Sequence, residues 1–385
     1  MISDCPICQH RATTELLVLQ NVPVHSVRLA ASAEAANAIP TGEIRLLACE
    51  HCNMAWNGAF DPKLVHYDGN YEETQAYSPR FQVFQQQFAA QLVKTFQLEG
   101  KTVLEIGCGK GEFLEALLDA GAAQVIGFDP SFDPTRARID ARMTVYAELY
   151  PPSRNVELTL PRIDFYVCKM TLEHVFQPRA FLTQLRTAIG NHDCLVAIQV
   201  PALERILSTT AYWDIYYEHC NYFSADALAK LFAVCGFAVI ESETIFDDQY
   251  LNVVARPVNV EQDKSACTSL PFATFNHKLH TELAAWRERL QPAATRQTLL
   301  IWGAASKAVA LLSALPELKT GTTLVDINPH KHGTYLPATE LVIHDPQQLR
   351  DRRFEVILVA NPIYLDEVTT MLRKLGIQGE IIALN

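Results

Sequence analysis

The sequence lacks the features that mark membrane and exported proteins. None of its apolar runs approaches the ~20 residues that a membrane-spanning helix needs. Its start, Met1–Cys5, shows no basic stretch followed by an apolar core, so we expect no export signal and a cytoplasmic location. Without export, the ten cysteines are expected to be reduced thiols, metal ligands or buried packing residues rather than a disulfide framework.

An excess of positive charge is also missing. The chain has 32 basic against 43 acidic residues, a formal net charge of -11. Binding to a nucleic-acid backbone uses basic surface to displace counterions, so the charge balance argues against a nucleic-acid partner. With 49% hydrophobic and 19% charged residues, disordered and fibrous classes are excluded. At ~150 residues per domain, the 385 residues suffice for two or three domains.

The pattern of expected elements divides the chain into four parts. Residues 1–65 hold short strand-like runs with cysteine pairs near both ends, and residues 66–256 alternate helix and strand patterns, as in a doubly wound parallel sheet. Residues 257–297 begin with a polar, turn-rich linker and continue as a helix with one apolar face. Residues 298–385 repeat the α/β alternation, so we predict an α/β protein with a small N-terminal module, a central Rossmann-like domain and a C-terminal Rossmann-like domain.

The order of strands in the central domain is itself informative. Four buried strands are expected at residues 102–106, 124–128, 164–168 and 194–198, with a helix at 112–120 after the first. Two further strands, near 237–240 and 250–254, have a connection too short for a parallel crossover. We therefore predict a parallel sheet with a late antiparallel pair, a pattern that resembles the class I methyltransferases.

The strongest local motif is the glycine-rich turn in the stretch VLEIGCGKG, residues 103–111. Its glycines let the backbone approach a ligand and expose amides at a helix start. Asp129 follows Gly107 by 22 residues, at the end of the next strand, where a carboxylate can accept from both ribose hydroxyls. A dinucleotide site would share both features. The G-x-G-x-G spacing and the preceding acid resemble motif I of the class I methyltransferases. This resemblance implies S-adenosylmethionine bound by Glu105, Gly107, Cys108, Gly109, Gly111 and Asp129.

Two C-x-x-C pairs, Cys5 with Cys8 and Cys49 with Cys52, lie in the first part of the chain. Four thiolates suit tetrahedral zinc, and two such pairs facing each other build a closed structural site. We therefore predict a zinc-binding N-terminal module in which the metal serves folding rather than catalysis. A redox pair or unligated thiols are the alternatives.

Two histidine-bearing segments are candidates for chemistry. The stretch TLEH, ending at His174, follows the strand expected at 164–168, at the ligand-binding edge of the sheet. The stretch IYYEHCNYFS, residues 215–224, precedes a helix that begins near Ala225, with Ser224 as a good N-cap. Its tyrosines, acid and histidine offer donors, an acceptor and a base of near-neutral pKa. Spacing alone is equally compatible with an aromatic corner of the core.

Taken in order, these features resemble one family. Two C-x-x-C pairs, the glycine motif, a Y-x-E-H-x-x-Y-F-S segment and a C-terminal Rossmann-like domain are similar to the zinc-containing sugar C-methyltransferases, which act on nucleotide-linked 4-ketosugars in deoxysugar biosynthesis. The resemblance covers nearly the whole chain. It implies His219 as the base, Glu218 as its support, and Tyr216, His174 and an N-terminal tyrosine, Tyr71 or its competitor Tyr77, as further site residues.

Other functions stay open on the sequence. The motifs do not separate carbon from oxygen or nitrogen methylation, and an RNA methyltransferase with a zinc ribbon or a non-enzymatic scaffold are further readings. The net charge of -11 counts against RNA, and the intact glycine motif counts against a scaffold. In the last domain, residues 303–307 lack the glycine pattern of a dinucleotide binder, so we expect substrate anchoring or scaffold there. Lys307 and Asn361 are candidates to face the inter-domain cleft and meet a nucleotide diphosphate.

Overall fold

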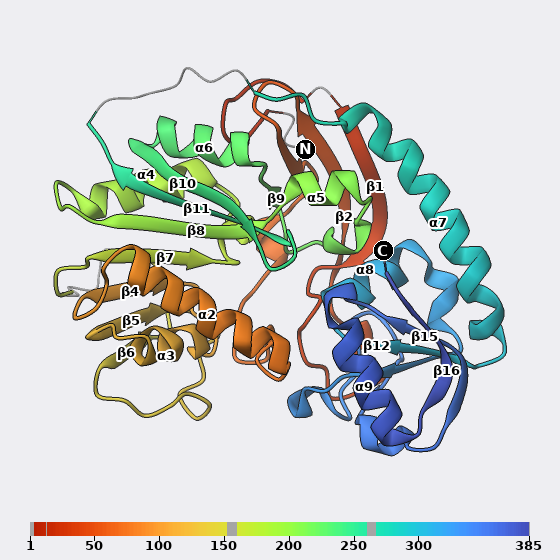
Figure 1. The fold of residues 1–385 in the computed structure, drawn as a ribbon. Helices are drawn as coiled ribbons and strands as arrows, with labels where there is room; N and C mark the ends of the chain where they lie inside the picture. Colours follow the sequence, from red (N-terminus) through yellow and green to blue (C-terminus); the bar gives the residue numbers. More distant parts are fainter. Residues whose placement is uncertain (1–3, 13, 152–159, 260–266, 385) are drawn as a thin grey trace.

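Seven strands of the central segment form the largest of three sheets in the computed structural model, which describes residues 4–12, 14–151, 160–259 and 267–384 (Figure 1). The strand order is β10-β11-β8-β7-β4-β5-β6. The strands are β4 (Thr102–Ile106), β5 (Gln124–Phe128), β6 (Met143–Tyr146), β7 (Phe165–Lys169), β8 (Leu195–Pro201), β10 (Phe237–Ile245) and β11 (Tyr250–Pro257).

The predicted late antiparallel pair is confirmed. Strands β4 to β8 run parallel, whereas β11 is antiparallel to both β8 and β10. Only four residues separate β10 from β11, and a parallel crossover would need about a dozen or more. The sheet therefore presents the carboxyl ends of β4, β5 and β7 at one common edge, where α/β sheets bind ligands.

Helices cover both faces of this sheet because its strands are apolar on both sides. Val103 packs with the helices α2 (Pro79–Thr95) and α3 (Glu112–Asp119), whereas its neighbour Leu104 packs in the cluster of α4 (Pro178–Ile189) and α6 (Ala225–Val234). Successive side chains of a strand point to opposite faces, which accounts for this division. Ser224 caps α6 as predicted, its side chain accepting from the Ala227 amide.

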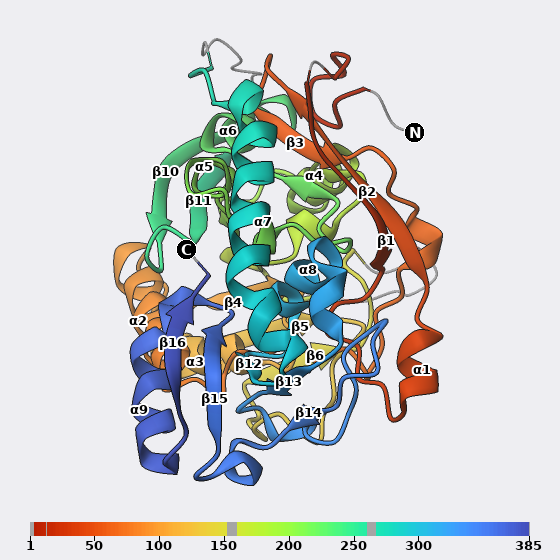
Figure 2. The same cartoon turned by 90° about the vertical axis from the view of Figure 1, so that its right-hand side faces the viewer.

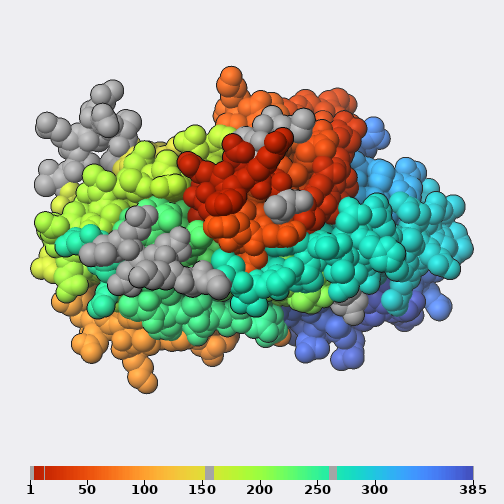
Figure 3. All heavy atoms as spheres, turned by 90° about the horizontal axis from the view of Figure 1, so that it is seen from above, coloured from red at the N-terminus to blue at the C-terminus, as the bar shows by residue number. Residues whose placement is uncertain are grey.

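The N-terminal sheet is completed by a strand from the central segment. Its antiparallel order is β1 (Thr14–Pro23), β2 (Thr41–Cys49), β3 (Met54–Asn57) and β9 (Asn221–Tyr222), with the short helix α1 (Ala33–Asn37) between β1 and β2. Because β9 lies within the IYYEHCNYFS stretch, the first 65 residues share their sheet with the segment that carries the candidate base. Seen from above, the N-terminal segment lies against the central segment and against the long helix α7 (Phe272–Thr295) (Figure 3).

The last part of the chain is a five-stranded parallel sheet in the order β14-β13-β12-β15-β16. Its elements are β12 (Leu299–Trp302), α8 (Ser306–Ala314), β13 (Thr322–Val325), β14 (Ile343–His344), β15 (Arg353–Val359), α9 (Leu365–Leu375) and β16 (Gln378–Ala383). Helix α7 runs alongside β1 toward this sheet (Figure 2) and buries the predicted apolar face, including Phe275 and Trp286. Of the predicted linker before α7, the structure describes residues 257–259 and 267–271.

One apolar cluster joins the N-terminal sheet to the last domain. It includes residues of β1 and β2, the helix α5 (Leu203–Ser208), α7, α8 and β12. The segment between α5 and β9 is packed into this cluster, so the candidate catalytic residues are anchored from two sides. Within the described ranges, no helix is both long and apolar enough to cross a bilayer.

Candidate active site

A cavity of about 670 Å³ lies at the carboxyl edge of the central sheet, and residues of the last domain also line it. Its size suits a cofactor together with a small substrate. The predicted cofactor and catalytic residues that line it are Tyr71, Glu105, Gly107, Cys108, Gly109, Asp129, His174, Tyr216 and His219. Gly111 and Glu218 are not among the lining residues, whereas Lys307, Asn361 and Tyr77 are.

The glycine turn between β4 and α3 is shaped for close approach. Gly107 and Gly109 have φ of 73° and 54°, in the left-handed region that other residues rarely adopt. A Cβ at Gly107 would collide with the Thr171 side chain, and a Cβ at Gly109 would lie 2.6 Å from Glu73 Oε1. The turn is therefore a cradle that a side chain would fill, which fits S-adenosylmethionine.

Asp129 is held against this turn at the end of β5. Its carboxylate accepts from the Gly109 amide at 2.9 Å and from the amide and hydroxyl of Ser131, both at 2.7 Å. Each carboxylate oxygen can accept more than one hydrogen bond, so these contacts orient the carboxylate and still leave it able to accept from a ligand. The ribose contact itself stays a prediction.

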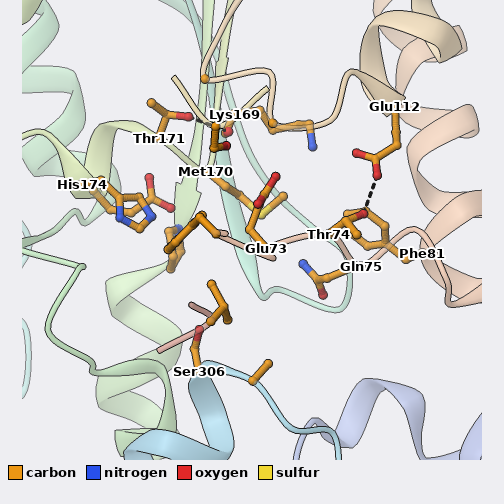
Figure 4. Close-up of a pocket in the computed structure, with 18 of the residues that line it drawn as sticks. Glu73, Thr74, Gln75, Phe81, Glu112, Lys169, Met170, Thr171, His174 and Ser306 are labelled. Atoms are coloured by element: carbon orange, nitrogen blue, oxygen red, sulfur yellow. Dashed lines mark hydrogen bonds between the residues drawn. The ribbon is translucent and has the colours of Figure 1, made fainter. Parts of the chain in front are cut away.

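A strap of the chain, residues 67–78, crosses the cavity between the two Rossmann-like domains. The buried Lys110 ammonium donates to the carbonyls of Tyr71 and Ser131 at 2.9 and 3.0 Å. Glu72 accepts from Arg136 of the central domain and from Asn328 of the last domain. Figure 4 shows Glu73, Thr74 and Gln75 of this strap between the Lys169–Thr171 side of the pocket and Ser306. The sequence predicts that the stretch 68–81 shapes a substrate pocket, and the structure places much of it in the lining of the cavity; Tyr71 and Tyr77 were its only individually predicted site residues.

Two histidines and a tyrosine meet beside the strap. The His219 ring lies 4.7 Å from the His174 ring and 3.9 Å from the Tyr216 ring, between centroids. Burial lowers the pKa of His174 to about 4 and that of His219 well below its usual range. Both imidazoles are therefore neutral at pH 7. Among the described residues, His219 Nδ1 has no hydrogen-bond partner, so the ring has a nitrogen free for proton transfer.

The structure corrects the expected role of Glu218. Its carboxylate accepts from the amide and hydroxyl of Ser26 at 2.7 and 3.0 Å rather than from the adjacent imidazole. The acid that faces His219 is Glu173, whose Oε1 lies 3.9 Å from His219 Nε2. The side chains of Glu218 and His219 thus have different partners, because Ser26 of the N-terminal segment donates both of its hydrogen bonds to Glu218. Burial raises the pKa of Glu173 to about 8 and that of Glu218 to about 7.

The N-terminal tyrosines occupy different places. Tyr71 is buried and its ring lies 5.0 Å from that of Tyr67, whereas Tyr77 is 37% exposed and packs beside His330. Tyr67, which sequence reasoning missed, has its hydroxyl 2.8 Å from His174 Nδ1. Of the two candidates, Tyr71 is thus the one that packs against Tyr67, the tyrosine whose hydroxyl contacts His174.

The four predicted metal ligands converge although the outermost two are 47 residues apart in the sequence. Cys5 Sγ lies 3.4 Å from Cys52 Sγ, and Cys8 Sγ lies 3.5 Å from Cys49 Sγ, with none of them in a disulfide. All four sulfur atoms are within 4.8 Å of one another. A tetrahedral site with Zn–S bonds of about 2.3 Å has sulfur atoms about 3.8 Å apart, so this donor set fits structural zinc.

The last domain contributes polar groups to the cavity. Lys307 pairs with Asp214, which also accepts from Arg205 at 3.1 Å. Ser306 Oγ lies 2.9 Å from Ser26 Oγ, and through Ser26 this hydroxyl is linked to Glu218. Lys307 and Asn361 therefore face the cleft, with the lysine already carrying an acidic partner.

Comparisons with known proteins agree with this arrangement. Residues 81–242 match a family model described as a methyltransferase domain, and residues 238–383 match one described as a C-methyltransferase C-terminal domain. The second match begins within β10, which pairs into the central sheet.

Two curated relatives match a short part of the chain. Both are tRNA U34 carboxymethyltransferases. The one from Dichelobacter nodosus is 35% identical over 97 residues, which is 24% of this chain and 31% of the relative. The one from Shewanella amazonensis is 30% identical over 93 residues, 21% of this chain and 28% of the relative. The chain thus matches about a third of the length of these relatives.

Solved methyltransferase structures align with somewhat less than half of the chain. The 1,6-didemethyltoxoflavin-N1-methyltransferase of Burkholderia thailandensis, solved with S-adenosylhomocysteine, is 18% identical and covers 48% of this chain and 84% of its own, at a TM-score of 0.36. Magnesium protoporphyrin IX methyltransferase from Synechocystis PCC 6803 is 17% identical, covering 46% and 83%, at a TM-score of 0.35.

The chain carries a methyltransferase domain over residues 81–242. More narrowly, a C-methyltransferase C-terminal domain follows over residues 238–383, and residues of both line the candidate site.

Proposed function

We propose that this enzyme methylates a carbon atom of a small molecule, a nucleotide-linked ketosugar, through an enolate formed by His219. The observation that carries the proposal is the buried, neutral His219 beside His174 and Tyr216, in a cavity shared by the cofactor cradle and the last domain. A carbon next to a ketone must lose a proton before it can act as a nucleophile, and this site offers a base together with hydrogen-bond donors.

The cofactor, cradled by the glycine turn and Asp129, supplies an electrophilic methyl group when bound. His219 accepts the proton from the carbon beside the ketone; the electron pair of that C–H bond forms a carbon–carbon double bond, and the π pair of the carbonyl moves to the ketone oxygen. The hydroxyls of Tyr216 and Tyr71 are the donors proposed to stabilise the resulting oxyanion. Glu173, facing His219 Nε2, takes the supporting role that was expected of Glu218.

The last domain is proposed to hold the nucleotide part of the substrate. Its cavity face combines the Ser306 hydroxyl, the Lys307 ammonium and Asn361, which suit phosphate and sugar oxygens. The cluster of four cysteines is proposed to hold one structural zinc ion, which takes no part in this chemistry because protein thiolates occupy all four ligand positions.

A transfer RNA substrate is the second candidate, since the curated relatives are tRNA-modifying enzymes. The net charge of -11 and the absence of a predicted basic footprint count against it.

The deciding experiment is product analysis. The enzyme is incubated with methyl-labelled S-adenosylmethionine and nucleotide-linked 4-ketosugars, and the labelled atom is located by NMR. A new carbon–carbon bond next to the ketone supports the proposal. A label on oxygen or nitrogen, or transfer to unmodified tRNA with none to any ketosugar, overturns it.

A further inference from the structure

Tyr67 lies at the start of the strap, and its hydroxyl contacts a residue of the candidate site. The Tyr67 oxygen is 2.8 Å from Nδ1 of His174, and the two rings meet edge to face with their centroids 5.8 Å apart. Burial raises the pKa of Tyr67 well above its usual value, so the hydroxyl keeps its proton near neutral pH. The tyrosine is therefore able to donate a hydrogen bond to the imidazole.

The backbone on both sides of Tyr67 is fixed to the N-terminal segment. The amide of His66 donates to His25 Nε2 at 3.1 Å. The Asp68 carboxylate pairs with Arg28 at 2.7 Å. These two contacts set the place of the tyrosine in the cavity wall, so its hydroxyl is held toward the imidazole by the fold itself.

The imidazole of His174 has a second partner, on the loop that carries the base. Burial lowers the pKa of His174 to about 4, and a hydrogen bond from the ring to the backbone carbonyl of Glu218 partly opposes this shift. A neutral imidazole has a single N–H, and a carbonyl can only accept a hydrogen bond. The N–H therefore lies on Nε2, toward Glu218, and Nδ1 accepts from Tyr67. Both contacts require the same tautomer of the ring.

This ring is in turn one wall of the space that His219 occupies. His219 directly follows Glu218, and its imidazole stands edge-on to that of His174, at 4.7 Å between centroids and an interplanar angle of 86°. A ring tied to the strap through one nitrogen and to the loop through the other cannot rotate freely. Such restraint matters for catalysis, because a displacement of about 1 Å in a reacting group can cost about 100-fold in rate.

We propose that Tyr67 is a positioning residue whose hydroxyl holds His174 in the Nε2–H tautomer and, through that ring, keeps His219 oriented for proton abstraction. The effect on the rate rests on the proposed function, because it concerns the base of that reaction, whereas the tautomer does not. Tyr67 acts through His174 and not on the substrate.

The first measurement is NMR of the full chain labelled with nitrogen-15 in histidine, without substrate. The ring signals of His174, identified by their loss in His174→Gln, should show a proton on Nε2 and a bare Nδ1 that accepts a hydrogen bond. In Tyr67→Phe, which removes only the hydroxyl, the Nδ1 signal should lose the shift typical of an accepted hydrogen bond. Tyr335→Phe is the matched control, because Tyr335 is a half-buried tyrosine that is not among the residues lining the cavity.

The second measurement is the rate of methyl transfer to a nucleotide-linked 4-ketosugar. Loss of one neutral hydrogen bond should lower kcat about 3- to 10-fold in Tyr67→Phe, with KM and the affinity for S-adenosylhomocysteine unchanged. His174→Leu should lower kcat at least as much, and adding Tyr67→Phe to it should cause no further loss. His174→Gln, whose amide can accept from Tyr67 and donate to the Glu218 carbonyl, should keep more activity and covers the case in which the leucine variant does not fold.

Three results overturn the proposal. One is a proton on Nδ1 of His174 in the parent enzyme, and another is an Nδ1 signal that is unchanged in Tyr67→Phe. The third is a further loss of kcat when Tyr67→Phe is added to His174→Leu, because the tyrosine would then act on the substrate directly. If the expected tautomer is present but no ketosugar is methylated, the proposed function fails together with the predicted rate effect, and the tautomer assignment is confirmed.

Discussion

Replacing His219 by asparagine separates carbon chemistry from heteroatom chemistry. Asparagine keeps much of the volume and some hydrogen bonding of the 4%-exposed ring but cannot accept the proton. The general base should therefore be lost while the packing against Tyr216 is largely preserved.

The expected loss follows from the surroundings of the ring. A positioned base contributes roughly 10²–10⁴-fold to a rate. The nearest other imidazole, His174, is engaged through Nδ1 with the Tyr67 hydroxyl at 2.8 Å, so it is a poor substitute. We expect methyl transfer to a ketosugar to fall by about 10²-fold or more in His219→Asn.

The assay follows deuterium from heavy water into the carbon beside the ketone, by mass spectrometry, with S-adenosylhomocysteine bound to block transfer. In the parent enzyme the hydrogen should exchange, and in His219→Asn exchange and methylation should fall together. His192→Asn, an exposed change, is the control and should behave as the parent. Because the pKa of His219 lies well below its usual range, the parental rate should show no loss of this base between pH 6 and 8.

Two results would refute this reasoning. Methylation by His219→Asn at the parental rate would make His219 a packing residue. Full methylation by the parent enzyme without any exchange of the carbon-bound hydrogen would point to an oxygen or nitrogen acceptor.

Three further predictions concern the acid, the cofactor and the metal. Glu173→Gln should slow methyl transfer above pH 8, where the parental carboxyl of pKa about 8 is charged, and should change the rate little at pH 6, where that carboxyl is already neutral. A pH–rate profile tests this, and an equal loss of rate at both pH values contradicts the pairing with His219. Asp129→Ala should weaken the binding of S-adenosylhomocysteine by about 10-fold or more in a titration, because a charged hydrogen-bond acceptor is lost. An affinity equal to that of the parent enzyme would reject the ribose placement. Elemental analysis should find one zinc ion per chain in protein purified without chelator, and Cys49→Ser should lower both the zinc content and the melting temperature. A parent protein that is stable and free of metal would reject the proposed zinc site.

Local patterns predicted six of the seven strands of the central sheet and the glycine turn, but not the edge strand β6. The G-x-G-x-G turn needs only a strand before it and a helix after it, and Asp129 follows at the end of the next strand. The short connection between β10 and β11 permits only an antiparallel pair. The apolar face of α7 was likewise predictable, because its apolar residues recur at helical spacing in the sequence.

The partners of the charged site residues were decided by tertiary structure alone. Glu218 accepts from the amide of Ser26, 192 residues earlier in the chain. The two residues meet because β9 pairs with β3 of the N-terminal sheet. Glu173 thereby becomes the acid nearest to His219. Tyr67 belongs to no motif, and its importance comes from the histidine that the fold places beside its hydroxyl. Sequence spacing specifies backbone conformation over a few residues, whereas the partner of a buried charge depends on which distant segments exclude water from it.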